Sequence, residues 1–273
     1  MKLLNTIAGL SGVVSAAQKP LSILDNSAES YRIPSSYESA VMGRRVLALT
    51  KLGTLSTVFQ QTSAHEIRPG GMEGQPIGLM DYVADCEDEG NPTILAIKIG
   101  TSFKNVRAGS NITLSMRWTP PYPPAKRLSL VSRLAAWVPF LSRHCPYDSE
   151  REHTELPDTV PYSAANLPRF SLFGYLEKIE TDDKKARELA VCYTAKHRDA
   201  KYWLPGNPIH SSEWMRLIVT HVYWIGGFGD RAYIGWIPVE EWKHVTKEDW
   251  QKIELPGEKK DWDEWHPAQS EEL

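Results

Sequence analysis

The chain has 273 residues, a length that suits one large domain or two small ones. Its net charge of −3 and its pI near 6.3 argue against a general attraction to nucleic acid or to an anionic membrane. Ten tryptophans and eleven tyrosines are more than a disordered chain carries, so we predict a globular protein. No apolar run after the N-terminal region is long enough to predict a transmembrane segment.

The first seventeen residues, MKLLNTIAGLSGVVSAA, have the order of a secretory signal peptide. Lys2 precedes an apolar stretch from Leu3 to Val14, and three small residues follow it. Polar residues within that stretch leave open a structural N-terminal segment instead. We expect a signal peptide over residues 1–17, with cleavage after Ala17, and therefore a protein that is secreted or resides in the lumen of the secretory pathway.

Two further features of the sequence bear on entry into the secretory pathway. Asn111 begins the sequon Asn-Ile-Thr, so we expect it to carry a glycan. The three cysteines, Cys86, Cys145 and Cys192, allow one disulfide and leave one thiol. Cys192 falls on the apolar face of a predicted helix, where a buried free thiol is the default interpretation. Cys86 and Cys145 lie in loop-like sequence and could pair in an oxidising compartment.

The first half of the chain predicts a helix followed by strands. An arm, residues 18–34, precedes Ser35, which forms a capping-box pattern with Glu38, so a helix should run to about Leu49. Short β-rich segments follow, and the segment 101–108 between two of them predicts a short helix. The predicted strands in this half are 52–60, 76–86, 93–99 and 112–118.

An insertion, residues 119–167, separates the two halves. Its stretch 127–144 could form a basic amphipathic helix, which would lie on a membrane surface or, more ordinarily, pack on its own domain. A helix over 181–197 is the clearest in the chain, because Asp182 and Asp183 occupy its first turn. Strands are predicted on both sides of it, and a tail, 246–273, should cross the surface of the main domain, 35–245. The predicted strands in this half are 169–180, 215–227 and 231–238.

Gly226, Gly227 and Gly229 could form a phosphate-binding loop or a turn between strands. A dinucleotide-binding loop needs its glycines to open a helix, and a Walker loop needs a Lys-Ser/Thr pair that is absent here. The sequence on both sides is β-rich instead. The pattern therefore predicts a bend or hairpin, not a nucleotide loop.

Other chemical motifs are weak. The eight histidines include no HExxH or Cys/His ligand pattern, so no metal site is predicted. His65 and Glu66 could form an acid–base pair, although an exposed loop pair is the more ordinary interpretation. His221, on the strand before the glycines, is the best candidate for a haem-binding or proton-handling role. A histidine with satisfied hydrogen bonds in the fold is its ordinary alternative.

The order of elements and several motifs resemble the split β-barrel of pyridoxamine 5'-phosphate oxidase-like proteins, and within them the CREG branch of secreted glycoproteins and its fungal relatives. The resemblance implies a mainly β fold with flanking helices (α+β), the FMN-binding split β-barrel. The GGFG element is also similar to a segment of haem-utilisation proteins with the same barrel. The resemblance covers about Tyr37 to Trp242, and its motifs are Gly53–Thr57, Lys104–Arg107, Ile112–Leu114, Ala195–His197 and residues 226–236.

The resemblance also indicates where an FMN phosphate would bind. FMN-binding members carry a Ser-Arg-Lys-like triplet before the short helix, and its cations meet the phosphate. Alignment on the strand ITLSM places this triplet on Gly100, Thr101 and Ser102, so both cations are missing. The Thr101 and Ser102 hydroxyls, Lys104 and Arg107 remain nearby and could bind FMN weakly, although helical spacing makes the two cations typical of a solvated face.

The resemblance to the CREG branch implies a homodimer that lacks a functional flavin site. We therefore expect a secreted split-barrel glycoprotein that binds a partner without catalysis and holds no cofactor tightly. The alternative is an FMN-dependent or haem-binding oxidoreductase, and similarity of fold alone does not choose between them.

Overall fold

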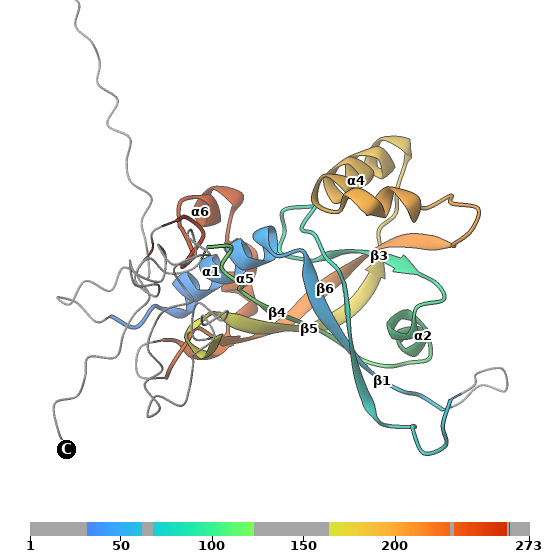
Figure 1. Cartoon of the computed structure of the whole chain (residues 1–273), viewed down its shortest axis with the longest axis horizontal. Coiled ribbons are helices and arrows are strands. Elements are labelled where there is room, and N and C mark those ends of the chain that lie inside the picture. The colour runs from blue at the N-terminus through green and yellow to red at the C-terminus, as the bar shows by residue number, and fades with distance from the viewer. Residues whose placement is uncertain (1–31, 62–67, 123–163, 230–231, 261, 263–273) are drawn as a thin grey trace, which may run out of the picture.

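The structure is a computed structural model that describes residues 32–61, 68–122, 164–229, 232–260 and 262 (Figure 1). In this part of the chain, seven strands form one antiparallel sheet with helices packed around it. The strands are β1 (Leu52–Val58), β2 (Pro76–Tyr82), β3 (Thr93–Ile97), β4 (Ile112–Arg117), β5 (Arg169–Lys178), β6 (Ser212–Ile225) and β7 (Ile234–Ile237).

Several sequence predictions fall outside the described residues. These are the signal peptide 1–17, most of the arm 18–34, the His65–Glu66 pair, Cys145, the stretch 127–144 and the end of the tail. None of the helices among the described residues has the length and apolar character that crossing a membrane requires.

The sheet has the strand order β2-β1-β4-β5-β6-β3, and β7 pairs with the second half of β6. Ala84, just after β2, exchanges backbone hydrogen bonds with Thr93 at the start of β3. This short bridge joins the two ends of the strand order, so the sheet closes on itself, with one isolated bridge at the seam among the described residues. The mainly β fold with flanking helices, the split β-barrel of the prediction, is thereby confirmed.

Buried and more exposed side chains alternate along the strands, which gives the sheet an inner face and an outer face. Leu55, Leu114 and Leu172 lie on neighbouring strands, are fully buried and fill the interior with Leu217 and Val222 from β6. Phe103 of α2 (Thr101–Arg107) packs into the same core. The intervening residues of β1, β4 and β5 are polar or half-exposed and form the outer face.

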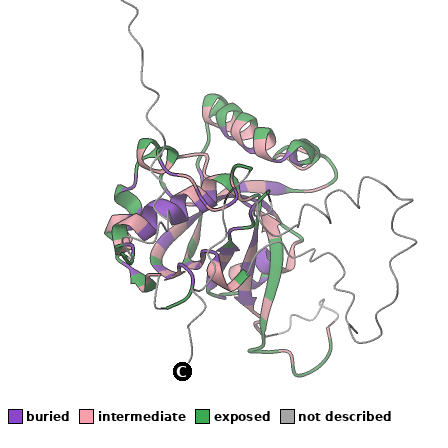
Figure 2. Ribbon diagram, turned by 60° about the vertical axis from the view of Figure 1, so that its left-hand side comes forward, coloured by how far each residue is buried: buried purple, intermediate pink, exposed green. Residues whose placement is uncertain are grey.

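Three helices gather at one end of the barrel: α1 (Ser36–Leu49), α5 (Val239–His244) and α6 (Lys247–Gln251) (Figure 1). The predicted capping box of α1 is present, because the Ser35 hydroxyl accepts from the Glu38 amide and the Glu38 carboxylate accepts from the Ser35 amide. Buried residues concentrate on α1 and the strands (Figure 2). Ile253 and Leu255, in the predicted tail, are buried in the same core.

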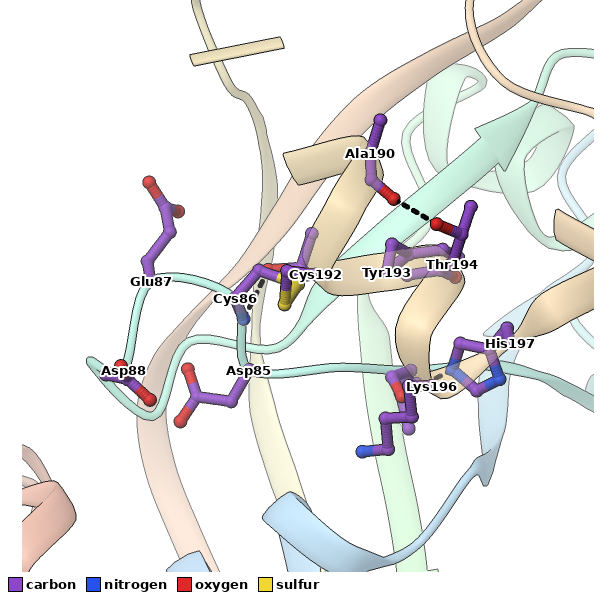
Figure 3. The surroundings of a disulfide bond; sticks show 12 residues. Asp85, Cys86, Glu87, Asp88, Ala190, Cys192, Tyr193, Thr194, Lys196 and His197 are labelled. Atoms are coloured by element: carbon purple, nitrogen blue, oxygen red, sulfur yellow. Dashed lines mark hydrogen bonds between the residues drawn. A yellow bond between two sulfur atoms is a disulfide. The ribbon is translucent and has the colours of Figure 1, made fainter. Parts of the chain in front are cut away.

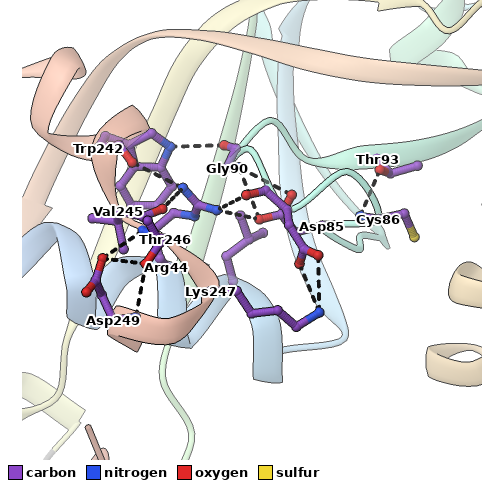
Figure 4. A network of polar contacts seen from close by, with 12 residues as sticks. Arg44, Asp85, Cys86, Gly90, Thr93, Trp242, Val245, Thr246, Lys247 and Asp249 are labelled. Atoms are coloured by element: carbon purple, nitrogen blue, oxygen red, sulfur yellow. Dashed lines mark hydrogen bonds and ion pairs between the residues drawn. The ribbon is translucent and has the colours of Figure 1, made fainter. Parts of the chain in front are cut away.

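Arg44 of α1 is fully buried and joins these helices to the β2–β3 loop (Figure 4). Its guanidinium donates to Asp85 Oδ2 at 3.1 Å and to the carbonyls of Asp88, Val245 and Trp242 at 2.8, 3.0 and 3.2 Å. A buried charge is tolerated only when it is paired and hydrogen-bonded, which these contacts achieve. Arg44 thus connects three segments that are far apart in the sequence.

Helix α4 (Asp183–Lys196) covers the outer face of the sheet at the other end (Figure 1). Asp182 caps it by accepting from the Lys185 amide at 2.7 Å. Leu189 and Tyr193 pack on Trp214 of β6 and form a second, smaller core. The short 3₁₀ turns η2 (Ala164–Asn166) and η3 (Arg198–Tyr202) precede β5 and follow α4.

The prediction for the cysteines was wrong. Cys192 is not a buried free thiol, because it forms a disulfide with Cys86 of the β2–β3 loop (Figure 3). This bond also rules out a Cys86–Cys145 pair. The helical pattern correctly placed Cys192 on the packed side of α4, but sequence did not reveal that the β2–β3 loop lies beneath that helix. The two Cα atoms are 5.8 Å apart although 106 residues separate them.

Candidate functional site

The predicted phosphate region lies on α2, the short helix that packs into the barrel. Ser102 is 4% exposed and Asn105 donates from Nδ2 to Thr57 Oγ1 at 3.0 Å, so one side of α2 belongs to the interior. Thr101 is half-buried. Lys104 is exposed, and Arg107 donates to the Lys98 carbonyl. The four predicted residues therefore share a helix without converging on one point.

The predicted glycine turn is confirmed. β6 and β7 pair in an antiparallel register from Ile225 opposite Ile234, so the glycine segment lies in the hairpin between them. The Gly226 amide donates to the Tyr233 carbonyl at 3.0 Å. A Cβ at Gly226 would lie 2.8 Å from Trp224 Nε1, which explains the need for glycine there. Gly227 and Gly229 continue this loop and, unlike a nucleotide-binding loop, open no helix.

His221 lies on the outer face of β6 and is exposed. Its Nδ1 is 3.0 Å from Thr220 Oγ1, and its ring meets that of Trp236 edge-on at 6.2 Å. Both interpretations of His221, the haem-binding or proton-handling role and the histidine with satisfied hydrogen bonds, therefore stay predictions. Within the described ranges, no group of three or more His, Cys, Asp or Glu side chains comes together as a metal site.

The motif Ala195–Lys196–His197 joins α4 to β2. The buried His197 ring stacks on Tyr82 at 4.6 Å, and its Nε2 donates to the Val83 carbonyl at 3.0 Å. Burial lowers the pKa of His197 and lowers that of Lys196 to about 8. Lys196 Nζ donates to the Leu47 carbonyl at 2.9 Å. These contacts attach the end of α4 to the barrel and to α1, which is a structural role.

A pocket of about 500 Å³ lies on the outer face of the barrel, over β1, β4, β5 and β6. We call it the outer-face pocket. Thr54, Ser115, Ser171 and Tyr223 lie directly opposite one another on successive strands. The Ser115 and Ser171 hydroxyl oxygens are 2.8 Å apart. The residues that line the pocket are Thr50, Leu52, Gly53, Thr54, Met80, Ser115, Met116, Arg117, Thr119, Arg169, Phe170, Ser171, Tyr223 and Ile225.

Two arginines lie side by side in this pocket. Arg117 at the end of β4 is directly opposite Arg169 at the start of β5. Arg169 Nη1 donates to the carbonyls of Ala165 and Leu167 at 3.3 and 3.5 Å. Arg117 is exposed, and its guanidinium makes no hydrogen bond or ion pair with the described residues. The described lining residues include no Asp or Glu, so no carboxylate among them balances the two positive charges.

Sequence reasoning missed this pocket. The described residues that line it include none of the predicted site residues, which lie on α2, on β6 and in the β6–β7 hairpin. The alternation of burial along β4 puts Ser115 and Arg117 on the outer face, a pattern that usually means a solvated face. A long insertion separates Arg117 from Arg169, so only the β4–β5 register brings them together. The signal in the sequence was one arginine near the end of the predicted strand 112–118 and another at the start of the predicted strand 169–180.

Comparison with solved structures finds several proteins of similar fold. A haem-binding protein from Mycobacterium smegmatis is 17% identical with a TM-score of 0.43, and the match covers 82% of this chain but only 63% of that protein. An FAD-binding protein from Mesorhizobium loti is 12% identical with a TM-score of 0.37, covering 70% of this chain and 94% of the other. The haem storage protein HutZ from Vibrio cholerae is 12% identical with a TM-score of 0.37, covering 70% and 95%.

No curated protein sequence matches the chain significantly. The family model for the CREG β-barrel, in contrast, matches residues 34–244. This range runs from the residue before the α1 cap to the end of α5 and includes every strand of the sheet. The chain therefore belongs to the CREG β-barrel family.

Proposed function

We propose that this protein is a non-catalytic binding protein of the secretory pathway whose FMN phosphate site is degenerate. The side chains present on α2 support the proposal of a degenerate phosphate site. A phosphate dianion is best held by converging cationic donors, and the two expected cations are replaced by Thr101 and Ser102. Ser102 is buried, Lys104 is exposed on the same short helix, and Arg107 already donates to a backbone carbonyl. The residues present do not fit an FMN phosphate.

The absorbance spectrum of the purified full-length protein tests this proposal. We expect a colourless protein with only aromatic absorbance. A flavin band would contradict the proposal and favour the alternative of an FMN-dependent oxidoreductase. A Soret band would instead favour a haem-binding protein. Adding FMN or haemin to the protein, followed by gel filtration, would show whether a cofactor lost during purification binds again.

Two structural features support the secretory part of the proposal. The Cys86–Cys192 disulfide is of the kind that persists in oxidising compartments. Asn111 is exposed at the start of β4, where a glycan could be attached without disturbing the core. N-terminal sequencing of secreted material should begin near Gln18, and glycosidase treatment should increase its gel mobility unless Asn111 is changed to Gln. Secreted protein that begins at Met1 would contradict the signal peptide.

A homodimer is the third part of the proposal. Large apolar side chains remain exposed on the outer face, with Tyr175 at 55% and Trp236 at 56%. Exposed aromatic residues on one face are typical of surfaces that another protein covers. Light scattering after gel filtration should give twice the monomer mass. Trp236→Lys should shift the protein toward the monomer, whereas a wild-type monomer at all concentrations would contradict this part.

A further inference from the structure

We propose that the outer-face pocket binds a small amphipathic organic anion. Its acidic group would lie between Arg117 and Arg169, and its apolar part would lie against Leu52, Tyr223 and Ile225. The inference rests on the proposed binding function and names the chemistry of the ligand.

The two arginines give the charge argument. Like charges directly opposite on neighbouring strands destabilise a sheet, so a facing arginine pair needs a reason. No Asp or Glu among the described lining residues neutralises the pair, and Arg117 keeps its donors free of other described residues. Guanidinium groups bind carboxylate, sulfonate or phosphate oxygens in a bidentate manner. An anion between them would convert repulsion into attraction.

The rest of the pocket sets the size and polarity of the ligand. A volume of about 500 Å³ lies within the range of small-molecule sites and is far larger than an inorganic anion needs. Leu52, Met80 and Ile225 supply apolar wall, and Tyr223 supplies an aromatic one. The Ser115–Ser171 hydroxyl pair lies between the apolar walls and could bond a polar atom in the middle of the ligand. The pocket thus suits a molecule with one acidic end and a ring-sized apolar body.

A matched pair of fluorescent probes tests the proposal on the wild-type protein. 8-Anilino-1-naphthalenesulfonate and N-phenyl-1-naphthylamine share the same aromatic body, and only the first carries a sulfonate. We expect the sulfonate probe to bind at least about tenfold more tightly, since one charge-assisted hydrogen bond contributes that much. Added salt should lower the affinity for the sulfonate probe and leave the affinity for the neutral probe unchanged. Equal affinity for the two probes, or no binding of either, would overturn the proposal.

Three variants locate the binding. Arg117→Gln and Arg169→Gln should each lower the affinity for the sulfonate probe by about tenfold or more and leave the affinity for the neutral probe unchanged. Arg187→Gln is the matched control, because Arg187 is exposed on α4 and does not line the pocket. Equal loss in all three variants, or no loss in the pocket variants, would contradict the proposal. Arg117 is exposed, so its variant should fold even if Arg169→Gln does not.

Failure of the anion-pocket proposal can be distinguished from failure of the proposed non-flavin function. A flavin or Soret band in the same preparation would refute the non-flavin function without deciding whether the arginines bind anions. Loss of selectivity for the sulfonate in a colourless protein would refute the anion pocket alone. If side chains of a second copy fill the pocket, the wild-type dimer will bind neither probe, which overturns the proposal directly.

Discussion

Single residues decide how this barrel is held together, and Arg44 is the clearest case. Its charge is removed from water at a point where α1, α5 and the β2–β3 loop meet. Beside it, the Trp242 indole donates to the Gly90 carbonyl at 2.9 Å. Sequence reasoning placed Arg44 on a helix but gave no sign that its partners would come from residues about 40 and 200 positions away.

Arg44→Ala should lower the free energy of unfolding by about 3–5 kcal/mol, because it leaves the Asp85 carboxylate buried without its cation. Urea unfolding followed by tryptophan fluorescence measures the loss. Arg187→Ala, an exposed change on α4, should alter stability by less than about 0.5 kcal/mol. Arg44→Met combined with Asp85→Leu should recover much of the loss. An Arg44→Ala protein as stable as the wild type would show that the network contributes little.

Asp81 on β2 should give the protein a pH-dependent stability. Burial raises the pKa of its carboxyl from 3.8 to about 6, only partly offset by the hydrogen bond from the Tyr82 amide. The folded state therefore binds a proton that the unfolded state has released between pH 3.8 and about 6. The stabilising effect is complete below pH 3.8 and is lost as the pH rises through about 6.

Asp81→Asn isolates this contribution. Relative to the wild type, the variant should gain about 2–3 kcal/mol of stability as the pH rises through this range, because it cannot ionise. Denaturation midpoints of both proteins across the range measure the difference. Parallel pH profiles of the two proteins would mean that Asp81 titrates normally in the folded state.

Helices and strands could be predicted where their sequence pattern is local, but the pairing of the strands could not. The capping box at Ser35 and Glu38, the alternation in β4 and the charged first turn of α4 each lie within one short segment. The pairing of β3 with β6 joins residues more than 110 positions apart and leaves no periodic trace. The lack of a long-range signal in the sequence also explains why Cys192 was predicted wrongly and why the outer-face pocket was missed. Both depend on which segments become neighbours.

The disulfide should hold α4 on the barrel. It closes a loop of 106 residues between the β2–β3 loop and α4, so chain entropy predicts a loss of about 4–5 kcal/mol without it. Cys86→Ser combined with Cys192→Ser, or reduction of the wild type, should lower the denaturation midpoint accordingly. Limited proteolysis should then cut near α4 first, because the second core there is small. Cys145→Ser serves as the control, because Cys145 is outside this bond.

At the scale of the whole molecule, the barrel and its possible ligand sites are separable. The sheet closes, its interior is filled and two groups of helices cover its ends. The fold could therefore be predicted from its resemblance to a family, whereas the site could not, because a few outward-facing side chains decide it. Arg117 is exposed, so it can be changed without disturbing the buried core.

Restoring one cation tests whether the charge at α2, rather than the barrel, explains the expected lack of FMN binding. Thr101 is half-buried at the first position of α2, so Thr101→Arg can reach solvent, whereas Ser102→Lys would bury an ammonium at a site that is 4% exposed. We expect Thr101→Arg to raise FMN affinity by about tenfold, the lower limit for one charge-assisted hydrogen bond. Thr101→Gln, of similar length and no charge, should have no such effect. Quenching of FMN fluorescence measures both. Tight FMN binding by the wild type would contradict the degenerate site, and equal affinity in all three proteins would place the deficit in the shape of the barrel surface around α2 instead.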